Sequence, residues 1–567
     1  MAGKNAPLAP SWDNTGTFPI VNYDTILPPR IFGYTYTAPD GYERFIGTTY
    51  DDYAPLENNV TFYDSEFTMP PYSASYDITG DFIDSAFIVN GIKTNITGNF
   101  VGHNTVLRNL NRGSDQISSL GNINANFIGT RGVFNIIEAK NRASGYVAEI
   151  KSINSKLVAG NPENGFLINY NGTVGDINVE TAINNVGFND GDDNVMGGYI
   201  TNIGTADFYY MPQYEYVVPT PKKAVAAETY IGSNDSRISN PEKYSAQIGN
   251  ISGNIIGNMA LGSRFAAGGA IYNYFGQIGD ISADFLGNSA RFFNPEIDIE
   301  QIDNPEIIVR PQGIAAVSSK QYGGAIANYN GKIGTITGNF KDNYAEGPGI
   351  AGGGAIYNSI YLQGFTQPIV QEYAGPKDAE TKNAIGLDDV YAERMNIEGS
   401  TFENNYAHST GKNVYGGAIY NDFYFYNAIE GNHTYLNYED NYLQQGYVYM
   451  TDDELQQKVI DTKANAALTL TNTNFINNHA DSDNGRAFGG AIYSTGDVNI
   501  IAKDGKTSLF SGNTANGESN AIYMSASTSE TYYIEYKDIN PLLPSNLNLT
   551  ATNNGVIQFD DAIDGEG

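Results

Sequence analysis

Two short sequence units recur along this chain of 567 residues and restrict the folds that it can adopt. One unit, IGxIxxxFxxNxA, is represented by IGDISADFLGNSA and IGTITGNFKDNYA. The two units alternate, and one uninterrupted repeat is 30 residues long, from Gly323 to Gly353. A length near 570 would ordinarily suggest about three or four domains, but such a repeat predicts a stack of similar units instead. The other unit, GGAIYN, and its near copies begin at Gly268, Gly323, Gly353, Gly416 and Gly489.

Each unit has the composition of short strands joined by turns. In IGDISADF, Ile278, Ile281 and Phe285 are apolar, and glycine, aspartate and serine lie between them. Apolar runs of four to six residues bounded by Gly, Asn and Asp are typical of β-strands and turns. The frequent glycines rule out helices built on these units.

A strand-and-turn unit of this size cannot bury its apolar face alone, but stacked copies can cover one another. We therefore expect Ile to stack on Ile, Phe on Phe, and the Asn of FxxN to form a ladder of buried amides. Paired glycines would supply tight corners. The predicted fold is an all-β parallel β-helix with loop and short helical insertions, whereas unrelated β-sandwiches would not repeat one hexapeptide. The expected corner and ladder residues are Gly268, Gly269, Asn288, Gly323, Gly324, Asn343, Gly353, Gly354, Asn405, Gly416, Gly417, Asn478, Gly489 and Gly490.

The regularity of the repeats divides the chain. Insertions interrupt the regular part, and the last of them contains Thr451 and Glu454 at the spacing of a capping box, which predicts a short helix. Residues from about Asp378 also have helical composition. We expect a less regular N-terminal cap at 1–76, degenerate rungs at 77–206, a Tyr/Pro-rich insertion at 207–247, regular repeats at 248–525 with insertions at 291–320, 359–394 and 422–467, and truncated terminal rungs at 526–567.

The composition excludes several classes of function. With 31 Lys+Arg against 63 Asp+Glu, the net charge of −32 argues against nucleic acid or an anionic membrane as the partner. The absence of cysteine excludes disulfides, Cys-based zinc sites, thiol catalysis and Cys-ligated iron–sulfur clusters. No run approaches the ~18 apolar residues of a membrane-spanning helix, so direct membrane insertion is not expected. The start, MAGKNAPLAPSWDN, lacks the apolar region of a secretory signal.

The alternation of GGA[ILV] and FxxN resembles the repeats of the polymorphic outer-membrane proteins and related autotransporter adhesins of Gram-negative bacteria. The resemblance covers about residues 248–525. The GGA[ILV] matches are Gly268–Ile271, Gly323–Ile326, Gly353–Ile356, Gly416–Ile419 and Gly489–Ile492, and the FxxN matches are Phe285/Asn288, Phe340/Asn343, Phe402/Asn405, Phe475/Asn478 and Phe510/Asn513.

This resemblance implies a right-handed β-helix that is exported as a type V secretion passenger and displayed at the bacterial outer-membrane surface. It also implies a C-terminal outer-membrane barrel in the native chain, and adhesion to a protein or glycan of a host or neighbouring cell. The chain departs from the family in lacking a signal peptide, a barrel and any cysteine. If the resemblance holds, the sequence is a fragment of a passenger, and the native chain extends further in both directions.

Tyrosine-rich insertions are the candidate binding surface, because binding residues of solenoids usually lie on loops. Tyrosine offers a large amphipathic contact area at low entropic cost. The alternative is that these side chains fold back and pack on the rod. The candidates are Tyr209, Tyr210, Tyr214, Tyr424, Tyr426, Tyr435, Tyr438 and Tyr442.

Catalysis is the competing class of function, because parallel β-helices also carry polysaccharide lyases and hydrolases that use clustered carboxylates. The acidic pairs of this chain fall in loops and at a helix start, and Lys and Arg are scarce in the repeats. We therefore expect no catalytic residues. A polysaccharide-active enzyme remains one alternative, and a phage tailspike or self-associating filament remains another.

Metal binding has weak support in the sequence. The runs NDGDDN at 189–194 and DSDNG at 481–485 are similar to calcium loops, but neither completes an EF-hand pattern. The resulting calcium candidates are Asp190, Asp192, Asp481 and Asp483, and no other cofactor is expected. His408 and His479 both follow FxxN, which indicates a shared turn position rather than a metal site.

Overall fold

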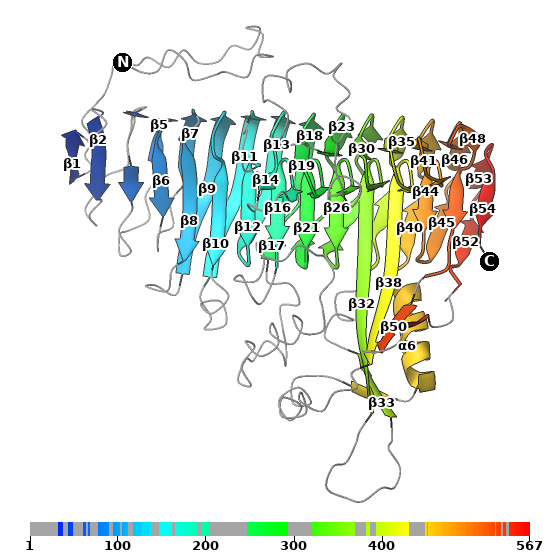
Figure 1. Ribbon diagram of the computed structural model, residues 1–567. Helices are drawn as coiled ribbons and strands as arrows, with labels where there is room; N and C mark the ends of the chain where they lie inside the picture. The colour runs from blue at the N-terminus through cyan, green and yellow to red at the C-terminus, as the bar shows by residue number, and fades with distance from the viewer. Residues whose placement is uncertain are drawn as a thin grey trace, which may run out of the picture.

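The computed structural model describes residues 32–37, 43–48, 60–63, 66–68, 78–89, 95–102, 105–111, 117–137, 147–160, 165–189, 194–204, 246–292, 319–368, 381–385, 393–429, 448–450, 452–527, 529–533, 537–539 and 544–566. These residues form a rod in which the strands of successive rungs lie side by side in chain order (Figure 1). The rod is a parallel β-helix, as the repeats predict. Among the described residues, no helix is long and apolar enough to cross a membrane.

Sheet B runs the length of the rod, and its strands pair in parallel from each rung to the next. Its main path is β3 (Val60–Tyr63), β5 (Ile78–Ile83), β7 (Ile96–Val101), β9 (Ile117–Ile128), β11 (Val147–Ala159), β13 (Thr173–Ile183), β18 (Ile251–Ile256), β23 (Asp284–Leu286), β29 (Phe340–Lys341), β35 (Thr401–Glu403), β41 (Asn474–Ile476), β46 (Thr507–Ser511) and β53 (Val556–Phe559). Beside it lie β17 (Ala246–Ile248), β22 (Gly276–Ile278), β27 (Lys332–Ile333), β28 (Thr335–Ile336), β34 (Asn396–Glu398), β40 (Leu468–Thr471), β45 (Val498–Ala502) and β52 (Leu547–Ala551).

Sheet A forms a second face and begins with an antiparallel hairpin of β1 (Phe32–Thr37) and β2 (Glu43–Thr48). The strands that follow pair in parallel, and each GGAIYN unit supplies one of them. They are β4 (Glu66–Thr68), β6 (Ala86–Val89), β8 (Val106–Asn111), β10 (Val133–Ile137), β12 (Leu167–Tyr170), β16 (Ile200–Ile203), β21 (Ile271–Tyr274), β26 (Ile326–Tyr329), β32 (Ile356–Pro368), β38 (Ile419–Ile429), β44 (Ile492–Ser494), β49 (Ile522–Met524) and β54 (Ile563–Gly565).

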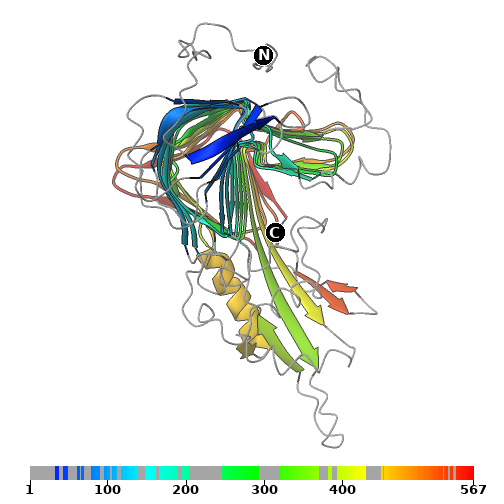
Figure 2. The same ribbon diagram turned by 90° about the vertical axis from the view of Figure 1, so that its left-hand side faces the viewer.

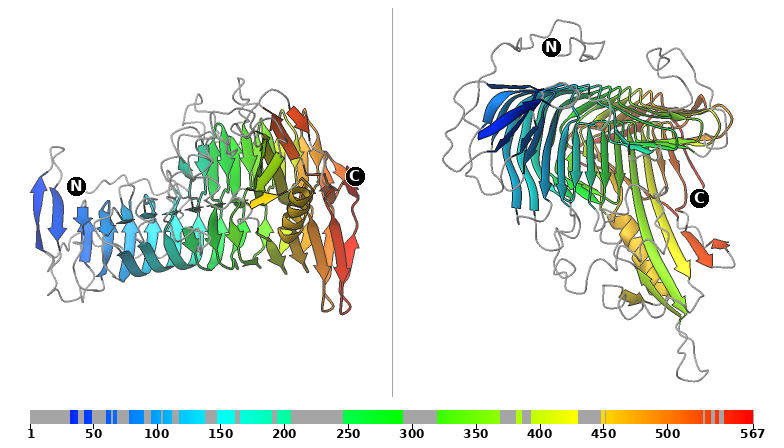
Figure 3. Two further views of the ribbon diagram at one scale, coloured as in Figure 1. Left: turned by 90° about the horizontal axis from the view of Figure 1, so that it is seen from below. Right: turned by 60° about the vertical axis from the view of Figure 1, so that its left-hand side comes forward.

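Two short sheets widen the later rungs into a lobe that we call the wing, drawn in green to orange in Figure 3. Sheet D consists of β14 (Phe188–Asn189), β15 (Asn194–Met196), β20 (Phe265–Ala267), β25 (Lys320–Tyr322), β31 (Ile350–Gly352), β37 (Val414–Tyr415) and β43 (Ala487–Phe488). Sheet C consists of β19 (Met259–Gly262), β24 (Ser289–Phe292), β30 (Tyr344–Gly347), β36 (Tyr406–Ser409), β42 (His479–Ser482), β47 (Thr514–Ala515) and β48 (Glu518–Ser519). Apart from the β14–β15 and β47–β48 hairpins, neighbouring strands of the wing run parallel.

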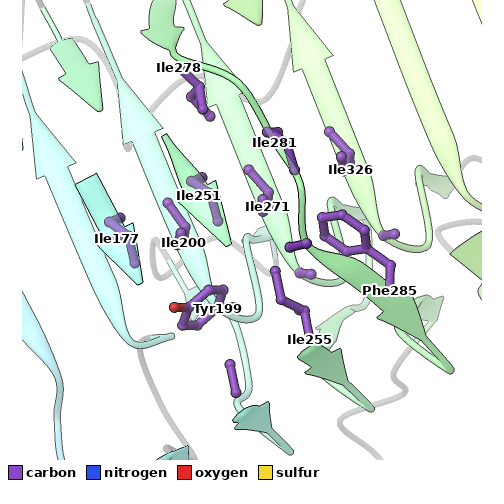
Figure 4. Packing of buried hydrophobic residues seen from close by; sticks show 14 of the residues in the cluster. Ile177, Tyr199, Ile200, Ile251, Ile255, Ile271, Ile278, Ile281, Phe285 and Ile326 are labelled. Atoms are coloured by element: carbon purple, nitrogen blue, oxygen red, sulfur yellow. The ribbon is translucent and has the colours of Figure 1, made fainter. Parts of the chain in front are cut away.

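The interior consists of columns of like residues, which confirms the predicted stacking. Ile200, Ile271 and Ile326 occupy one register position in successive rungs and are fully buried (Figure 4). The FxxN phenylalanines form a second column, with ring centroids 4.6–4.9 Å apart from rung to rung. That column is Phe285, Phe340, Phe402, Phe475 and Phe510, and Phe559, which is followed by Asp-Asp-Ala, continues it in the last rung.

The paired glycines form the corners as predicted, and the two positions have different reasons to be glycine. The first glycine of each pair has positive φ, as in Gly323 at +64°. The second lies against the next rung, so a Cβ atom on Gly324 would stand 2.0 Å from the carbonyl oxygen of Gly354. Positive φ and close backbone approach both exclude larger side chains.

The predicted amide ladder is present. Asn343 Nδ2 donates to Asn405 Oδ1 at 2.9 Å and to the Phe285 carbonyl at 3.0 Å, while Asn343 Oδ1 accepts from the backbone and side-chain nitrogens of Asn288. Every polar atom of this fully buried amide is therefore satisfied, which burial requires. The ladder comprises Asn185, Asn258, Asn288, Asn343, Asn405, Asn478 and Asn513.

A second ladder, which was not predicted from the sequence, is made by the last residue of GGAIYN and by the Asn residues that align with it in earlier rungs. In it each Nδ2 donates to the Oδ1 of the next rung at 2.8–2.9 Å. Its members are Asn109, Asn135, Asn169, Asn202, Asn273, Asn328, Asn358 and Asn421. The two ladders and the aromatic column fix the register of neighbouring rungs.

The helical expectations had different outcomes. The helix that Thr451 and Glu454 indicate is α6 (Asp452–Asn465), the one helix among the described residues. The helical composition from about Asp378 was misleading, because Thr381–Ile385 is strand β33, paired antiparallel with β32. Helix propensity is a weak preference that pairing with a long neighbouring strand overrides.

Replacing Asn343 by Ala should remove four hydrogen bonds of a buried amide and leave the backbone N–H of Asn288 without its acceptor. We expect the free energy of unfolding to fall by about 3–5 kcal/mol. Asn339→Ala is the matched control: Asn339 precedes β29 whereas Asn343 follows it, and removal of its exposed side chain should cost about 1 kcal/mol or less. Urea denaturation followed by circular dichroism measures both, and equal losses would contradict the role of the ladder.

Gly324→Ala should destabilise the rod by about 3–5 kcal/mol, because the added methyl group would meet the carbonyl of Gly354. Gly287→Ala should cost only about 1–2 kcal/mol, since Gly287 has a φ of +62° but no other atom lies within 4 Å of the place that its added methyl group would take. Thermal unfolding of the two variants distinguishes steric exclusion from backbone strain, and a larger loss in Gly287→Ala would contradict this account.

Candidate functional site

Three segments that are far apart in the sequence meet in one projection, which we call the arm. Strands β32 and β38 continue past the neighbouring rungs as a parallel pair, and β33 joins β32 antiparallel (Figures 1 and 2). Strand β39 (Val448–Met450) pairs with β33, and β50 (Ser529–Tyr533), which pairs with β51 (Lys537–Ile539), pairs with β38. Helix α6 lies beside this sheet (Figure 2). The insertions thus form one appendage instead of separate loops.

The base of the arm contains a carboxylate among tyrosines. Asp422 lies where β38 leaves the rod, and its oxygens accept hydrogen bonds from the Tyr357 hydroxyl at 3.2 Å and the Thr495 hydroxyl at 3.1 Å. Tyr322 stacks on Tyr357 with ring centroids 4.4 Å apart. The hydrogen bonds and stacked rings tie β38 to β32 and to the wing.

Burial is the main cause of the pKa shifts at the base of the arm. It raises the pKa of Asp422, although the hydroxyl donors oppose the shift. Burial also raises the pKa values of Tyr322 and Tyr357, and the charge of Asp422 adds to both shifts. The pKa of Lys320 is lowered by burial against the attraction of Asp422. These directions are typical of polar groups that are held in a buried, structural cluster.

Most of the predicted tyrosine surface lies outside the described residues, namely Tyr209, Tyr210, Tyr214, Tyr435, Tyr438 and Tyr442. Tyr424 and Tyr426 both lie on β38 in the arm, opposite Tyr361 and Gln363 of β32. The Tyr424 side chain is half-buried. The structure therefore brings two candidates together in the arm and leaves the other six as predictions.

A row of charged side chains crosses sheet C on the wing. Arg291, Glu346 and His408 occupy the same register position on β24, β30 and β36. Arg291 donates to Glu346 Oε2 at 3.3 Å, and His408 Nε2 lies 3.2 Å from Asp483 Oδ1. His408 Nδ1 lies 3.6 Å from Glu346 Oε1. We call these four residues the ionic row.

The pKa of His408 rises to about 9. The hydrogen bond to Glu346 is the largest cause of this rise, and Asp483 adds to it, whereas burial opposes it. The pKa of Glu346 is lowered, first by His408. His408 is therefore positively charged at neutral pH and balances two carboxylates.

The ionic row was missed in the sequence, although a signal existed. When the repeats are aligned on FxxN, the third residue after Asn reads Arg291, Glu346, His408 and Asp481 in successive rungs. Parallel in-register pairing turns such a sequence column into a row of neighbours. The alignment would have predicted Arg291, Glu346 and His408 as neighbours, but not Asp483, which lies two residues beyond the aligned position.

The calcium candidates do not come together as a metal site in the described residues. No group of three or more His, Asp or Glu side chains there is arranged to hold a metal ion. Asp481 lies on β42, and Asp483 faces His408. Asp190 and Asp192 lie outside the described residues. Calcium binding stays a prediction.

Comparison of the chain with known proteins identified no relative. No protein-family model, curated protein or solved structure matches the chain.

The ionic row predicts a pH-dependent contribution to stability. The folded-state pKa of His408 lies above its usual value of 6.5, so the contribution is complete below about pH 6.5 and is lost as pH rises through about 9. His408→Gln should therefore be less stable than the unmodified chain by about 1 kcal/mol or less, because the row is partly exposed to solvent. Urea midpoints at several pH values measure this, and a difference that grows above pH 9 would contradict the assignment.

Proposed function

We propose that this chain is a non-catalytic adhesion module exported to the surface of a bacterium. Its partner would be a protein or glycan on a host or neighbouring cell, and the rod would serve as the scaffold. The observation that carries the proposal is the arm, in which insertions around three rungs converge on one side of an otherwise regular stack. Solenoids typically bind through such additions to their repeats.

The chemistry of the arm supports a recognition role. Tyr424 and Tyr426 lie on its central strand pair, and Tyr435, Tyr438 and Tyr442 follow in the segment between β38 and β39. Tyrosine contacts both protein and glycan surfaces with its ring while its hydroxyl forms hydrogen bonds. The anchored base at Asp422 would hold this surface at a fixed angle to the rod.

The resemblance to autotransporter adhesins points in the same direction. It rests on the GGA[ILV] and FxxN repeats, and these repeats form the corners, the aromatic column and one amide ladder of the rod. An exported passenger anchored through an outer-membrane barrel would place the arm outside the cell. The net charge of −32 agrees with a partner other than nucleic acid.

A polysaccharide-active enzyme is a second candidate, and the ionic row favours it. The row places two carboxylates, an imidazolium and a guanidinium on the outer surface of a parallel sheet. Charged at neutral pH, His408 could donate a proton but not accept one. Incubation with acidic and neutral polysaccharides tests this candidate, and chain cleavage that disappears in His408→Gln would establish it over adhesion.

Adhesion is tested by binding of the labelled chain to epithelial cells, bacterial cells and a glycan array. Replacement of Tyr435, Tyr438 and Tyr442 by Ser should weaken binding at least about tenfold, because a few aromatic residues usually dominate such interfaces. The matched control replaces Tyr344 and Tyr406, which stack on the wing, by Ser. Binding that survives the arm substitutions but fails in the wing variant would refute the arm as the binding site. A chain that binds none of these surfaces would refute the adhesion proposal itself.

A further inference from the structure

Helix α6 carries a lysine that reaches out of the arm into the last rungs of the rod. Lys463 is 3% exposed, and its Nζ donates to the Pro544 carbonyl at 2.7 Å and to the Ser527 hydroxyl at 3.3 Å. The same nitrogen lies 3.8 Å from Oδ1 of Asp497, which is 5% exposed. The amine and the carboxylate are thus both held inside the protein.

The same carboxylate contacts a side-chain amide. Asn546, immediately before β52, donates its backbone N–H to Asp497 Oδ1 at 2.9 Å. Its Nδ2 lies 3.3 Å from Oδ1 and 3.2 Å from Oδ2 of Asp497. Asp497 therefore contacts both a buried amine and a carboxamide.

We propose that Lys463 and Asn546 form an intramolecular isopeptide bond, with Asp497 as the group that transfers the proton. Because Asp497 contacts both groups, their reaction would be an intramolecular step in place of an encounter in solution. The bond would join the helix of the arm to the rung of β52, β53 and β54.

The atoms balance without any further reactant. The lone pair of the neutral Lys463 Nζ attacks Cγ of Asn546, and the carbonyl electrons move to Oδ1. Asp497 takes a proton from the attacking nitrogen and delivers it to Nδ2. The oxygen then restores its double bond, the bond from Cγ to Nδ2 breaks, and ammonia leaves. The products are a secondary amide and one molecule of ammonia.

The surroundings favour each part of this reaction. Burial lowers the pKa of Lys463 to about 8, against the attraction of Asp497, so that part of the amine is neutral near physiological pH. Asn546 is exposed, which gives ammonia a way out. Because the chain contains no cysteine, no disulfide can tie the arm or this rung in place.

The bond would also stabilise the last rung of the rod. Leu549 and Ile563 are 50% and 43% exposed, whereas Ile500 and Ile522, on which they stack, are fully buried. No described strand covers the outer side of this rung. A covalent link from α6 to the residue before β52 would hold it against peeling.

The test is the intact mass of the purified, folded chain. We expect a mass below the sequence mass by one ammonia molecule, and a protease digest in which the peptides containing Lys463 and Asn546 are joined. Lys463→Arg should restore the sequence mass, as should Asp497→Asn, whereas Lys503→Arg, at an exposed lysine, should retain the loss of ammonia. Circular dichroism confirms folding of each variant.

Two further measurements separate this bond from other reactions. A chain kept in denaturant should lack the cross-link and gain it after refolding, at a rate that rises with pH up to about 8. An unmodified wild-type mass would overturn the proposal, as would loss of ammonia that persists in Lys463→Arg. Loss of water with Lys463 joined to Asp497 would overturn Asn546 as the acyl donor. The outcome is independent of adhesion, because it requires no binding partner.

Discussion

A side-chain amide buried in the rod must be hydrogen-bonded, and the amides of the FxxN ladder find their partners in the rungs before and after their own. Asn288, Asn343 and Asn405 satisfy that requirement by bonding to one another and to backbone carbonyls. A rung displaced by one residue would leave each amide unpaired at a cost of about 1–3 kcal/mol per group. The ladders therefore fix register, and register in turn aligns the isoleucine and phenylalanine columns. The wing and the arm depend on that alignment.

The ladders have a direction, which means that their ends need different chemistry. Each Nδ2 donates toward the C-terminal rungs, so the last amide needs an acceptor. Asn421 donates to the Ser494 hydroxyl, which donates in turn to the Gly496 carbonyl. At the end of the other ladder, Asp561 accepts from the backbone and side chain of Asn513. A carboxylate accepts without donating, so it satisfies the final amide and ends the series.

The structural features that depend on repeated motifs can be predicted from the sequence. The contacts between segments that do not repeat cannot. The FxxN ladder, the phenylalanine column and the glycine corners follow from the motifs alone. The second ladder was not predicted, although most copies of GGAIYN end in an Asn at the same position. The arm could not be predicted, since β33 and β50 carry no repeat signature and pair with the extended ends of β32 and β38. Of the candidate site, only the location of Tyr424 and Tyr426 in the arm could be tested.

The same register that aligns the core restricts the charges outside it. A repeat position recurs about every 4.8 Å along a parallel stack, so an acid at the same position of every repeat would form a column of like charges. The outer rows avoid this by alternating side chains. In one turn, Asp176, Asn250, Asp280 and Thr335 follow one another, and each carboxyl or amide oxygen accepts the next backbone N–H at 2.8 Å. In the wing, arginine, glutamate and histidine alternate in sign. This constraint accounts for a charged share of only 17% despite a net charge of −32: where repeats stack, amides and hydroxyls must supply most of the polar surface.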